Sequence, residues 1–199
     1  PLPLKEIKNL VLANATRIEW EEVCPVTDNS IIYVIGNPPY IGSKKQDKMQ
    51  KADMAKVFNG IKDYKNLDYV ACWFYIGSQY IKKSNSELAF VSTNSITQGE
   101  QVAGVWKPLC ERFGIHIDFA HRTFRWDSEA SIKAHVHCVI VGFSTAPNHK
   151  LKQLYSSERV QLVDNINFYL IEAPTIFVEY QKCQKCLKEV VLLMVETSF

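Results

Sequence analysis

The sequence predicts an α/β fold built around a mostly parallel sheet. Short apolar runs rich in β-branched residues alternate with longer helical patterns, in the order strand, helix, strand, helix, strand, strand between residues 31 and 143. The segment between the last two strands is too short for an ordinary crossover helix, so the last strand is expected to pair antiparallel. With 199 residues, 47% of them hydrophobic, the chain can bury a sizeable core.

The first part of the chain supplies two strands and two helices. Residues 9–13 (NLVLA) predict a short buried strand, and residues 31–35 (IIYVI) predict a stronger one because they are β-branched or apolar throughout. Apolar residues at helical spacing predict a helix over residues 47–61. Residues 68–81 are apolar almost all round, which indicates a deeply buried helix.

The second part repeats this alternation. Residues 88–91 (LAFV) predict a strand, and residues 102–113 predict a helix that Pro108 either starts late or kinks, with Gly114 closing it. Residues 115–120 (IHIDFA) predict the next strand. A loop is expected over residues 121–133, before the last strand at residues 136–143 (VHCVIVGF).

The strand and helix patterns weaken beyond Thr145. We therefore divide the chain into residues 1–145, which hold the α/β pattern, and residues 146–199, a C-terminal region of less regular pattern. Within this region, residues 165–170 start a new element and residues 182–199 predict one helix.

Bulk properties exclude some classes of protein. No apolar run reaches the roughly 20 residues that span a bilayer, and the first residues carry no signal-peptide pattern, so a cytoplasmic location is expected. Cys183 and Cys186 form one half of a zinc site without a second pair, so no metal is expected.

A stripe of lysines lies between residues 44 and 65, where seven Lys stand against three Asp. This local positive charge suits a nucleic-acid backbone. The alternative is an ordinary solvated helix face, and composition alone does not separate the two.

The tetrapeptide Asn37-Pro38-Pro39-Tyr40 follows directly after the strand at residues 31–35. Ligands of open parallel sheets bind at the carboxyl ends of strands. The two prolines make the backbone rigid and leave carbonyl oxygens free to accept hydrogen bonds, and the Asn37 side chain adds another acceptor. Two acceptors on the two N–H bonds of an aromatic amine would localise its lone pair, so Asn37 and the Pro38 carbonyl are candidates to activate such an amine.

Tyr40 offers a flat face on which a base can stack. A base inside a duplex reaches such a pocket only when it is flipped out, and stacking of about 1–3 kcal/mol would offset part of the unstacking cost. The alternative for the tetrapeptide is a plain turn after a strand, because Asn and Pro are common turn residues.

The segment IGNPPY resembles the catalytic motif of amino-methyltransferases that act on adenine N6 in DNA. Residues 88–99 (LAFVSTNSITQG), 119–126 (FAHRTFRW) and 135–143 (HVHCVIVGF) are similar to downstream motifs of type IIG/IIL restriction–modification proteins. Residues 14–20 (NATRIEW) look like the element after the third strand of that domain. The resemblance covers roughly residues 5–172.

The resemblance implies a Rossmann-like, S-adenosylmethionine-dependent methyltransferase fold of which the chain holds the carboxy-terminal half, with double-stranded DNA as substrate in a restriction–modification system. Residues 1–145 would then be a partial catalytic domain, and residues 146–199 the start of a target-recognition region or an irregular C-terminal region. It implies catalytic roles for Asn37, Pro38, Pro39 and Tyr40. Phe124 matches the aromatic residue that holds the flipped base from its other side, and Asn14, with Asn37, matches positions near the cofactor. Contacts to the DNA backbone would come from Lys44, Lys45, Lys48 and Lys51.

The sequence departs from this family where the cofactor is bound. The family uses a Gly-rich turn, whereas the eight Gly here are isolated and form no G-x-G. A partner chain supplying the amino-terminal half, or self-association through exposed sheet edges, is therefore expected. Two other functions stay open: methylation of protein glutamine N5, since those enzymes also carry NPPY, and a non-catalytic, truncated DNA-binding remnant.

Overall fold

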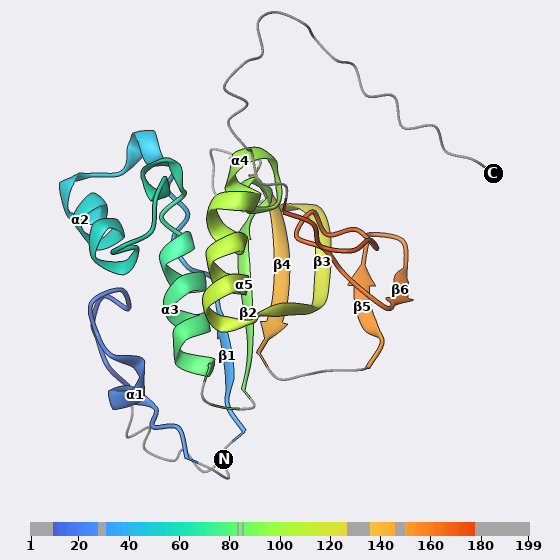
Figure 1. Cartoon of the computed structure of the whole chain (residues 1–199), viewed down its shortest axis with the longest axis horizontal. Coiled ribbons are helices and arrows are strands. Elements are labelled where there is room, and N and C mark those ends of the chain that lie inside the picture. The colour runs from blue at the N-terminus through green and yellow to red at the C-terminus, as the bar shows by residue number, and fades with distance from the viewer. Residues whose placement is uncertain are drawn as a thin grey trace, which may run out of the picture.

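The computed structural model describes residues 10–27, 31–82, 84, 86–126, 136–145 and 150–177. Their six strands form one sheet in the order β1-β2-β4-β3-β5-β6 (Figure 1). The strands are β1 (Tyr33–Gly36), β2 (Glu87–Thr93), β3 (His116–Trp126), β4 (Val136–Ser144), β5 (Lys152–Tyr155) and β6 (Val160–Val163).

The helices lie mostly between β1 and β3 in the chain. They are α1 (Trp20–Val23), α2 (Lys48–Val57), α3 (Ala71–Ile81), α4 (Gly99–Gln101) and α5 (Lys107–Phe113). Single 3₁₀ turns form η1 (Ser43–Lys45), η2 (Tyr64–Asn66) and η3 (Asn94–Thr97), and η4 (Val102–Trp106) is a π-helical turn. Among the described residues, none of these helices has the length and apolar character to cross a membrane.

The strand directions confirm the expected fold class. β1 pairs parallel with β2, β3 pairs parallel with β5, and β4 runs antiparallel between β2 and β3. β1, β2, β3 and β5 therefore all end at the same edge of the sheet, the upper one in Figure 1, which we call the carboxyl edge. In sheets of this kind ligands bind at that edge.

The core lies between the sheet and helix α3. Leu88 and Phe90 of β2 point toward α3 and are buried, whereas the alternate residues of the strand are half-exposed. The ring of Phe74 on α3 packs edge-on against Phe90 and Trp106, with centroids 5.3 Å apart in both pairs, and stacks on Phe143 of β4 at 5.5 Å. These aromatic contacts hold β2 and β4 firmly beneath α3.

The prediction of a strand at residues 9–13 is wrong for residues 10–13, which are the part of that run that the structure describes. Residues 10–13 form no strand, and Leu10, Val11 and Leu12 are exposed. A strand is stable only when a neighbour satisfies its hydrogen bonds, and no strand of the described residues pairs with this run.

The burial predicted for the strand at residues 31–35 is also wrong. The strand forms at Tyr33–Gly36, but Ile31, Tyr33 and Ile35 are exposed. The reason is its place in the sheet: β1 is an edge strand, and no described element covers the face that carries these side chains.

Helix boundaries differ from the predicted ones in ways that local chemistry explains. Helix α2 ends at Val57 rather than at residue 61, and Gly60 then adopts a left-handed conformation (φ 78°). In the predicted helix 102–113, the π turn η4 precedes α5, whose first turn holds Pro108, and Gly114 caps the end at φ 68°. The predicted role of Gly114 is thereby confirmed.

The C-terminal half of the sheet extends beyond the prediction. The prediction of a loop at residues 121–133 is wrong for residues 121–126, because β3 continues to Trp126. β5 and β6, beyond residue 145, join the same sheet through β3. Residues 165–170 form no helix or strand and contain one turn at 168–169. The helix predicted at 182–199, with Cys183 and Cys186, lies outside the described residues.

Candidate functional site

The tetrapeptide at residues 37–40 lies at the carboxyl edge, immediately after β1 ends at Gly36. Pro38 is buried, Asn37 and Pro39 are exposed, and Tyr40 is half-buried. The buried proline fixes the corner from inside while its neighbours remain open to a ligand. This is the placement that the sequence predicts for a binding loop.

The hydroxyl of Tyr40 joins the loop to the sheet. It lies close to the side chains of Asn37 and of Cys138 in β4, and both neighbours influence its pKa. Burial raises the pKa of Tyr40, and the neighbouring Cys138 raises it further, so the phenol stays neutral at physiological pH. Burial also raises the pKa of Cys138, which therefore remains a thiol.

Phe124 reaches the same place from β3. The prediction put it in a loop, but it lies within the strand, where its Cα is directly paired with that of Cys138. Since Cys138 also contacts Tyr40, the two aromatic residues predicted to hold a base flank one cysteine. Phe124 additionally packs edge-on against His121, with centroids 4.9 Å apart.

A β-bulge decides which way Phe124 points. His121 pairs with Ile140 and Phe124 pairs with Cys138, so three steps along β3 correspond to two along β4. Without the extra residue, Thr123 would face Cys138 and Phe124 would turn to the opposite face. The bulge therefore directs the aromatic ring to the tetrapeptide.

The chain after Tyr40 is clamped at Ile41. The Ile41 amide donates to Oδ1 of Asp68 over 2.8 Å, and the Ile41 carbonyl accepts from the Tyr69 amide and from Nε2 of Gln46, both at 3.0 Å. Burial raises the pKa of Asp68, while the hydrogen bonds from Val70 and Ile41 oppose the rise. These contacts fix both polar groups of the residue that follows the tetrapeptide.

Asn14 lies on a turn that the buried carboxylate of Asp53 holds against helix α2. Arg17 donates to Asp53 through Nε at 2.8 Å and Nη2 at 3.0 Å, and the Tyr69 hydroxyl donates over 2.8 Å. Nδ2 of Asn14 reaches Asp53 at 3.5 Å, while its Oδ1 accepts from the amide and hydroxyl of Thr16. The hydrogen bonds from Arg17 and Tyr69 outweigh burial and lower the pKa of Asp53.

Asn14 and Pro39 share one hollow of about 450 Å³. Its apolar walls include Met49 and Trp73, and Asn14 lies among the polar groups that line it. The structure thus brings the predicted cofactor residue Asn14 beside Pro39 of the tetrapeptide.

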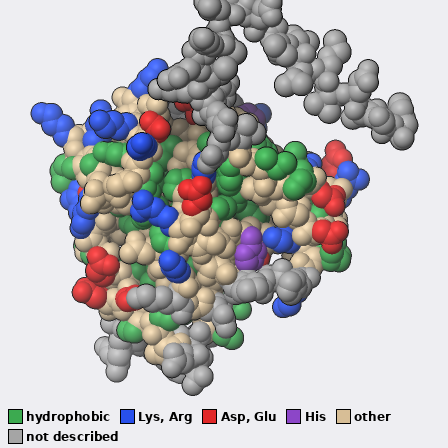
Figure 2. All heavy atoms as spheres, viewed as in Figure 1, with side chains coloured by type: hydrophobic (Ala, Val, Ile, Leu, Met, Phe, Trp, Pro, Cys, Tyr) green, Lys and Arg blue, Asp and Glu red, His purple; other side chains and the backbone are tan. Residues whose placement is uncertain are grey.

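The four lysines predicted to contact DNA are all exposed and close to the tetrapeptide in the chain. Lys44 and Lys45 belong to η1, and Lys48 and Lys51 to the first turns of α2. Figure 2 shows basic side chains gathered over the end of the molecule where α2 lies.

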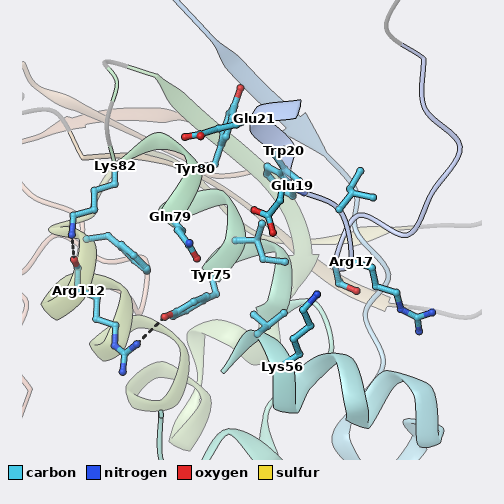
Figure 3. A pocket seen from close by; sticks show the side chains of 15 residues that line it. Arg17, Glu19, Trp20, Glu21, Lys56, Tyr75, Gln79, Tyr80, Lys82 and Arg112 are labelled. Atoms are coloured by element: carbon cyan, nitrogen blue, oxygen red, sulfur yellow. Dashed lines mark hydrogen bonds between the residues drawn. The ribbon is translucent and has the colours of Figure 1, made fainter. Parts of the chain in front are cut away.

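A larger hollow, of about 880 Å³, lies elsewhere, between α1, α2, α3 and α5 (Figure 3). Its basic groups are partly engaged in the fold: Arg112 donates to the Tyr75 hydroxyl, and Lys82 donates to the Arg112 carbonyl. None of the predicted site residues lines it, so size alone does not mark the site. Within the described chain, no cluster of three or more His, Cys, Asp or Glu side chains is arranged to hold a metal.

Sequence reasoning missed the supporting residues Gln46, Asp53, Asp68 and Tyr69. Asp68 carried a usable signal, because an acidic residue directly before an apolar helical run is typical of a helix start. Asp53 carried none, since it is one of three acids within the lysine stripe and its partners lie 16 and 36 residues away.

Comparisons with known proteins agree on one family. The family model described as "MmeI, DNA-methyltransferase domain" matches residues 1–156. DNA methyltransferase A of Bacillus subtilis (strain 168) is 47% identical over 177 residues, which cover 89% of this chain and 20% of that protein. The solved structure of the type IIL restriction–modification enzyme MmeI in complex with DNA superposes with a TM-score of 0.80 at 40% identity, covering 90% of this chain and 24% of that one.

Proposed function

This chain belongs to the MmeI DNA-methyltransferase domain family, and from that membership we propose that it forms the target-base half of a DNA methyltransferase that modifies adenine N6 in a restriction–modification system. The chain spans only a fifth to a quarter of the length of the relatives it matches. The observation that carries the proposal is the position of the tetrapeptide: it lies at a strand end, where its acceptors Asn37 and Pro38 and its Tyr40 ring are near Phe124 of β3.

The acceptors belong to Asn37 and Pro38. Oδ1 of Asn37 and the carbonyl oxygen of Pro38 each hold one N–H of the adenine amine, which localises the nitrogen lone pair. Fixed acceptors of this kind act through positioning and preorganised dipoles. The Tyr40 hydroxyl lies beside the Asn37 side chain, and an Asn37 amide that donates to this hydroxyl would leave Oδ1 free for the substrate.

The aromatic residues Tyr40 and Phe124 hold the two faces of the base. Both lie next to Cys138, Tyr40 by a side-chain contact and Phe124 by strand pairing. Each stacking contact contributes on the order of 1–3 kcal/mol, and together they offset the few kcal/mol needed to take a base out of the duplex.

The hollow beside Pro39 fits the adenine of S-adenosylmethionine, because its apolar and aromatic walls suit a flat heterocycle and Asn14 lies among its polar groups. S-adenosylmethionine supplies the methyl group when it is bound. The chain holds no Gly-rich turn, so we assign it only the adenine side of the cofactor site. The remaining contacts come from the other half of the domain.

That other half would pair with the exposed edge of β1. The described residues place Ile31, Tyr33 and Ile35 at this edge as exposed apolar side chains. An unpaired edge with apolar side chains is a template for a further strand, which either a complementary chain or a second copy of this chain would supply.

Double-stranded DNA would lie across the carboxyl edge. Lys44, Lys45, Lys48 and Lys51 extend from the loop after the tetrapeptide onto α2, where they can pair with phosphates. The MmeI relative was solved in complex with DNA, which supports the same class of partner here.

The experiment grafts this chain into DNA methyltransferase A in place of the matched 177 residues and supplies labelled S-adenosylmethionine. Duplex DNA and a release-factor protein serve as competing acceptors, since the second tests glutamine methylation. We expect label in DNA and a loss of at least about a hundredfold in Asn37→Ala, from removal of a preorganised dipole. Label in the protein acceptor, or unchanged DNA labelling in Asn37→Ala, contradicts the proposal.

A further inference from the structure

A second hollow at the carboxyl edge, of about 590 Å³, lies beyond Phe124 on the side of β5. We call it the polar groove. It is lined by Gln98 after η3, by Arg122 and Thr123 of β3, by Ser156 and Ser157 after β5, and by Tyr169. The proposed base site uses none of these side chains.

The bulge in β3 that orients Phe124 also forms one wall of the polar groove. Arg122 and Thr123 are the residues between the two registered pairs, His121 with Ile140 and Phe124 with Cys138. One irregularity therefore sends Phe124 toward the tetrapeptide and leaves Arg122 and Thr123 lining the groove. Bulges beside active sites commonly redirect side chains in this way.

The opposite wall is a loop held in an unfavourable conformation. Leu170 is a non-glycine residue at φ 56°, a conformation that costs on the order of 1–3 kcal/mol and concentrates at functional sites. Packing maintains it: Leu170 is buried, Phe168 stacks on Trp106 with centroids 4.8 Å apart, and Nε of Arg122 donates to the Leu170 carbonyl over 3.0 Å. The loop presents Tyr169, whose side chain is exposed.

The chemistry of the groove suits a nucleic-acid strand. The described residues that line it include hydroxyls, an amide, a guanidinium and a phenol, and no carboxylate. Hydroxyl, amide and Arg groups are the usual donors to phosphate oxygens, and an exposed tyrosine ring offers a face to a base.

We propose that the polar groove binds the DNA strand next to the flipped adenine, with Gln98, Arg122 and Thr123 at its backbone and Tyr169 against a neighbouring base. Arg122 and Thr123 directly precede Phe124 in β3, so the groove begins next to the proposed base site. The inference rests on the proposed function, because it takes the base between Tyr40 and Phe124 as its origin.

The test measures the affinity of the 199-residue chain for a fluorescent duplex in matched pairs of variants. Gln98→Glu places a carboxylate in the groove, and Gln79→Glu places the same group on the exposed side of α3, in the hollow of Figure 3. Tyr169→Ala is paired with Leu151→Ala, since Leu151 is equally exposed but lies just before β5, at the opposite edge of the sheet. All four side chains are exposed, so thermal melts are expected to show intact folds.

We expect Tyr169→Ala to weaken DNA binding at least about fivefold, the lower limit for loss of one stacked base. Gln98→Glu should weaken DNA binding several-fold at 0.01 M salt. The effect should be smaller at 0.15 M salt, because the Debye length is about 30 Å at the lower concentration and about 8 Å at the higher one. The two control variants should bind like the parent chain. Photo-crosslinking of Tyr169 to a duplex carrying 5-iodouracil beside the target adenine gives an independent readout.

The outcomes separate the two proposals. If the parent chain binds DNA and loss of the four lysines weakens it, while both groove variants bind normally, the groove inference is wrong and the proposed function stands. If neither the parent chain nor the grafted enzyme binds DNA at low salt, DNA is the wrong partner and both proposals fall.

Discussion

Replacing Asp53 by asparagine should destabilise the fold through one identifiable set of hydrogen bonds. The carboxylate accepts two hydrogen bonds from Arg17 and one from Tyr69. In Asp53→Asn the new amide hydrogens face donors, and the charge that Arg17 neutralises is gone. Each hydrogen bond to a charged group contributes about 1.5–3 kcal/mol.

The solvent exposure of Arg17 and Tyr69 determines how much unfolding free energy the Asp53→Asn variant loses. The Arg17 side chain is 40% exposed, so water rehydrates its guanidinium, whereas Tyr69 is 3% exposed and its hydroxyl loses a partner in the interior. We therefore expect a loss of about 2–3 kcal/mol, below the roughly 3–5 kcal/mol of a fully buried ion pair. For a chain of this size that corresponds to a fall in Tm of about 4–12 °C.

The pH dependence follows from the lowered pKa of Asp53. A carboxyl whose pKa is lower in the folded state stabilises the fold above its unfolded pKa, and that stabilisation disappears as the pH falls through the folded value. The ordinary pKa is 3.8. The difference between the parent chain and Asp53→Asn should therefore be constant above about pH 5 and close progressively below about pH 4.

Thermal melts from pH 3 to pH 8 measure this difference, with Asp63→Asn as the control. Asp63 is exposed and sits at φ 63°, a conformation that asparagine also adopts, so its replacement should change stability by less than about 0.5 kcal/mol. An Asp53→Asn penalty that is as large at pH 3 as at pH 7 would refute the ionic explanation, and no penalty at all would refute the hydrogen bonding itself.

Three further predictions rest on separate parts of the structure. Gly142→Ala places a methyl group in overlap with the Phe119 ring, so denaturant unfolding should show a loss of about 1–3 kcal/mol, most of which Phe119→Leu restores. Neutral replacements at all four predicted DNA-contacting lysines (Lys44, Lys45, Lys48 and Lys51) should make DNA affinity less sensitive to salt. The slope of log affinity against log salt concentration should decrease in magnitude by up to about 3.6, because each phosphate that a lysine neutralises adds about 0.9 to it. In the grafted enzyme, Phe124→Ala should lower the fluorescence rise of a 2-aminopurine base at the target position more than Phe124→Tyr does, because only alanine removes the stacking surface; equal signals would argue against the stacking role.

The apolar runs were sufficient to predict most strands, although β1 forms a strand with one face exposed. Residues 33–36, 87–93 and 136–144 each contain such a run, and each is a strand. Residues 10–13 have the same composition and no strand partner. The sequence of a segment indicates that it can form a strand. Whether it does so also depends on a neighbouring strand that can hydrogen-bond to it, and the segment alone does not reveal that neighbour.

The missed elements lacked a local signal for different reasons. β5 and β6 are four residues each and alternate with polar residues, so their periodicity is brief. The bulge at residues 122–123 depends on the register between β3 and β4, which no single segment determines. The tetrapeptide at residues 37–40 was accessible from sequence because two prolines and a strand end define the backbone locally, while the support from Asp53 and Asp68 arises only from tertiary packing.

The position of the methyl group on the product nucleoside tests the central claim most directly. DNA treated with the grafted enzyme is digested to nucleosides and analysed by mass spectrometry, in parallel with the Asn37→Ala variant. The account predicts N6-methyladenine that disappears with Asn37→Ala. Methylated cytosine, or N6-methyladenine that persists in the variant, would contradict the assignment of this strand end as the site that holds the adenine amine.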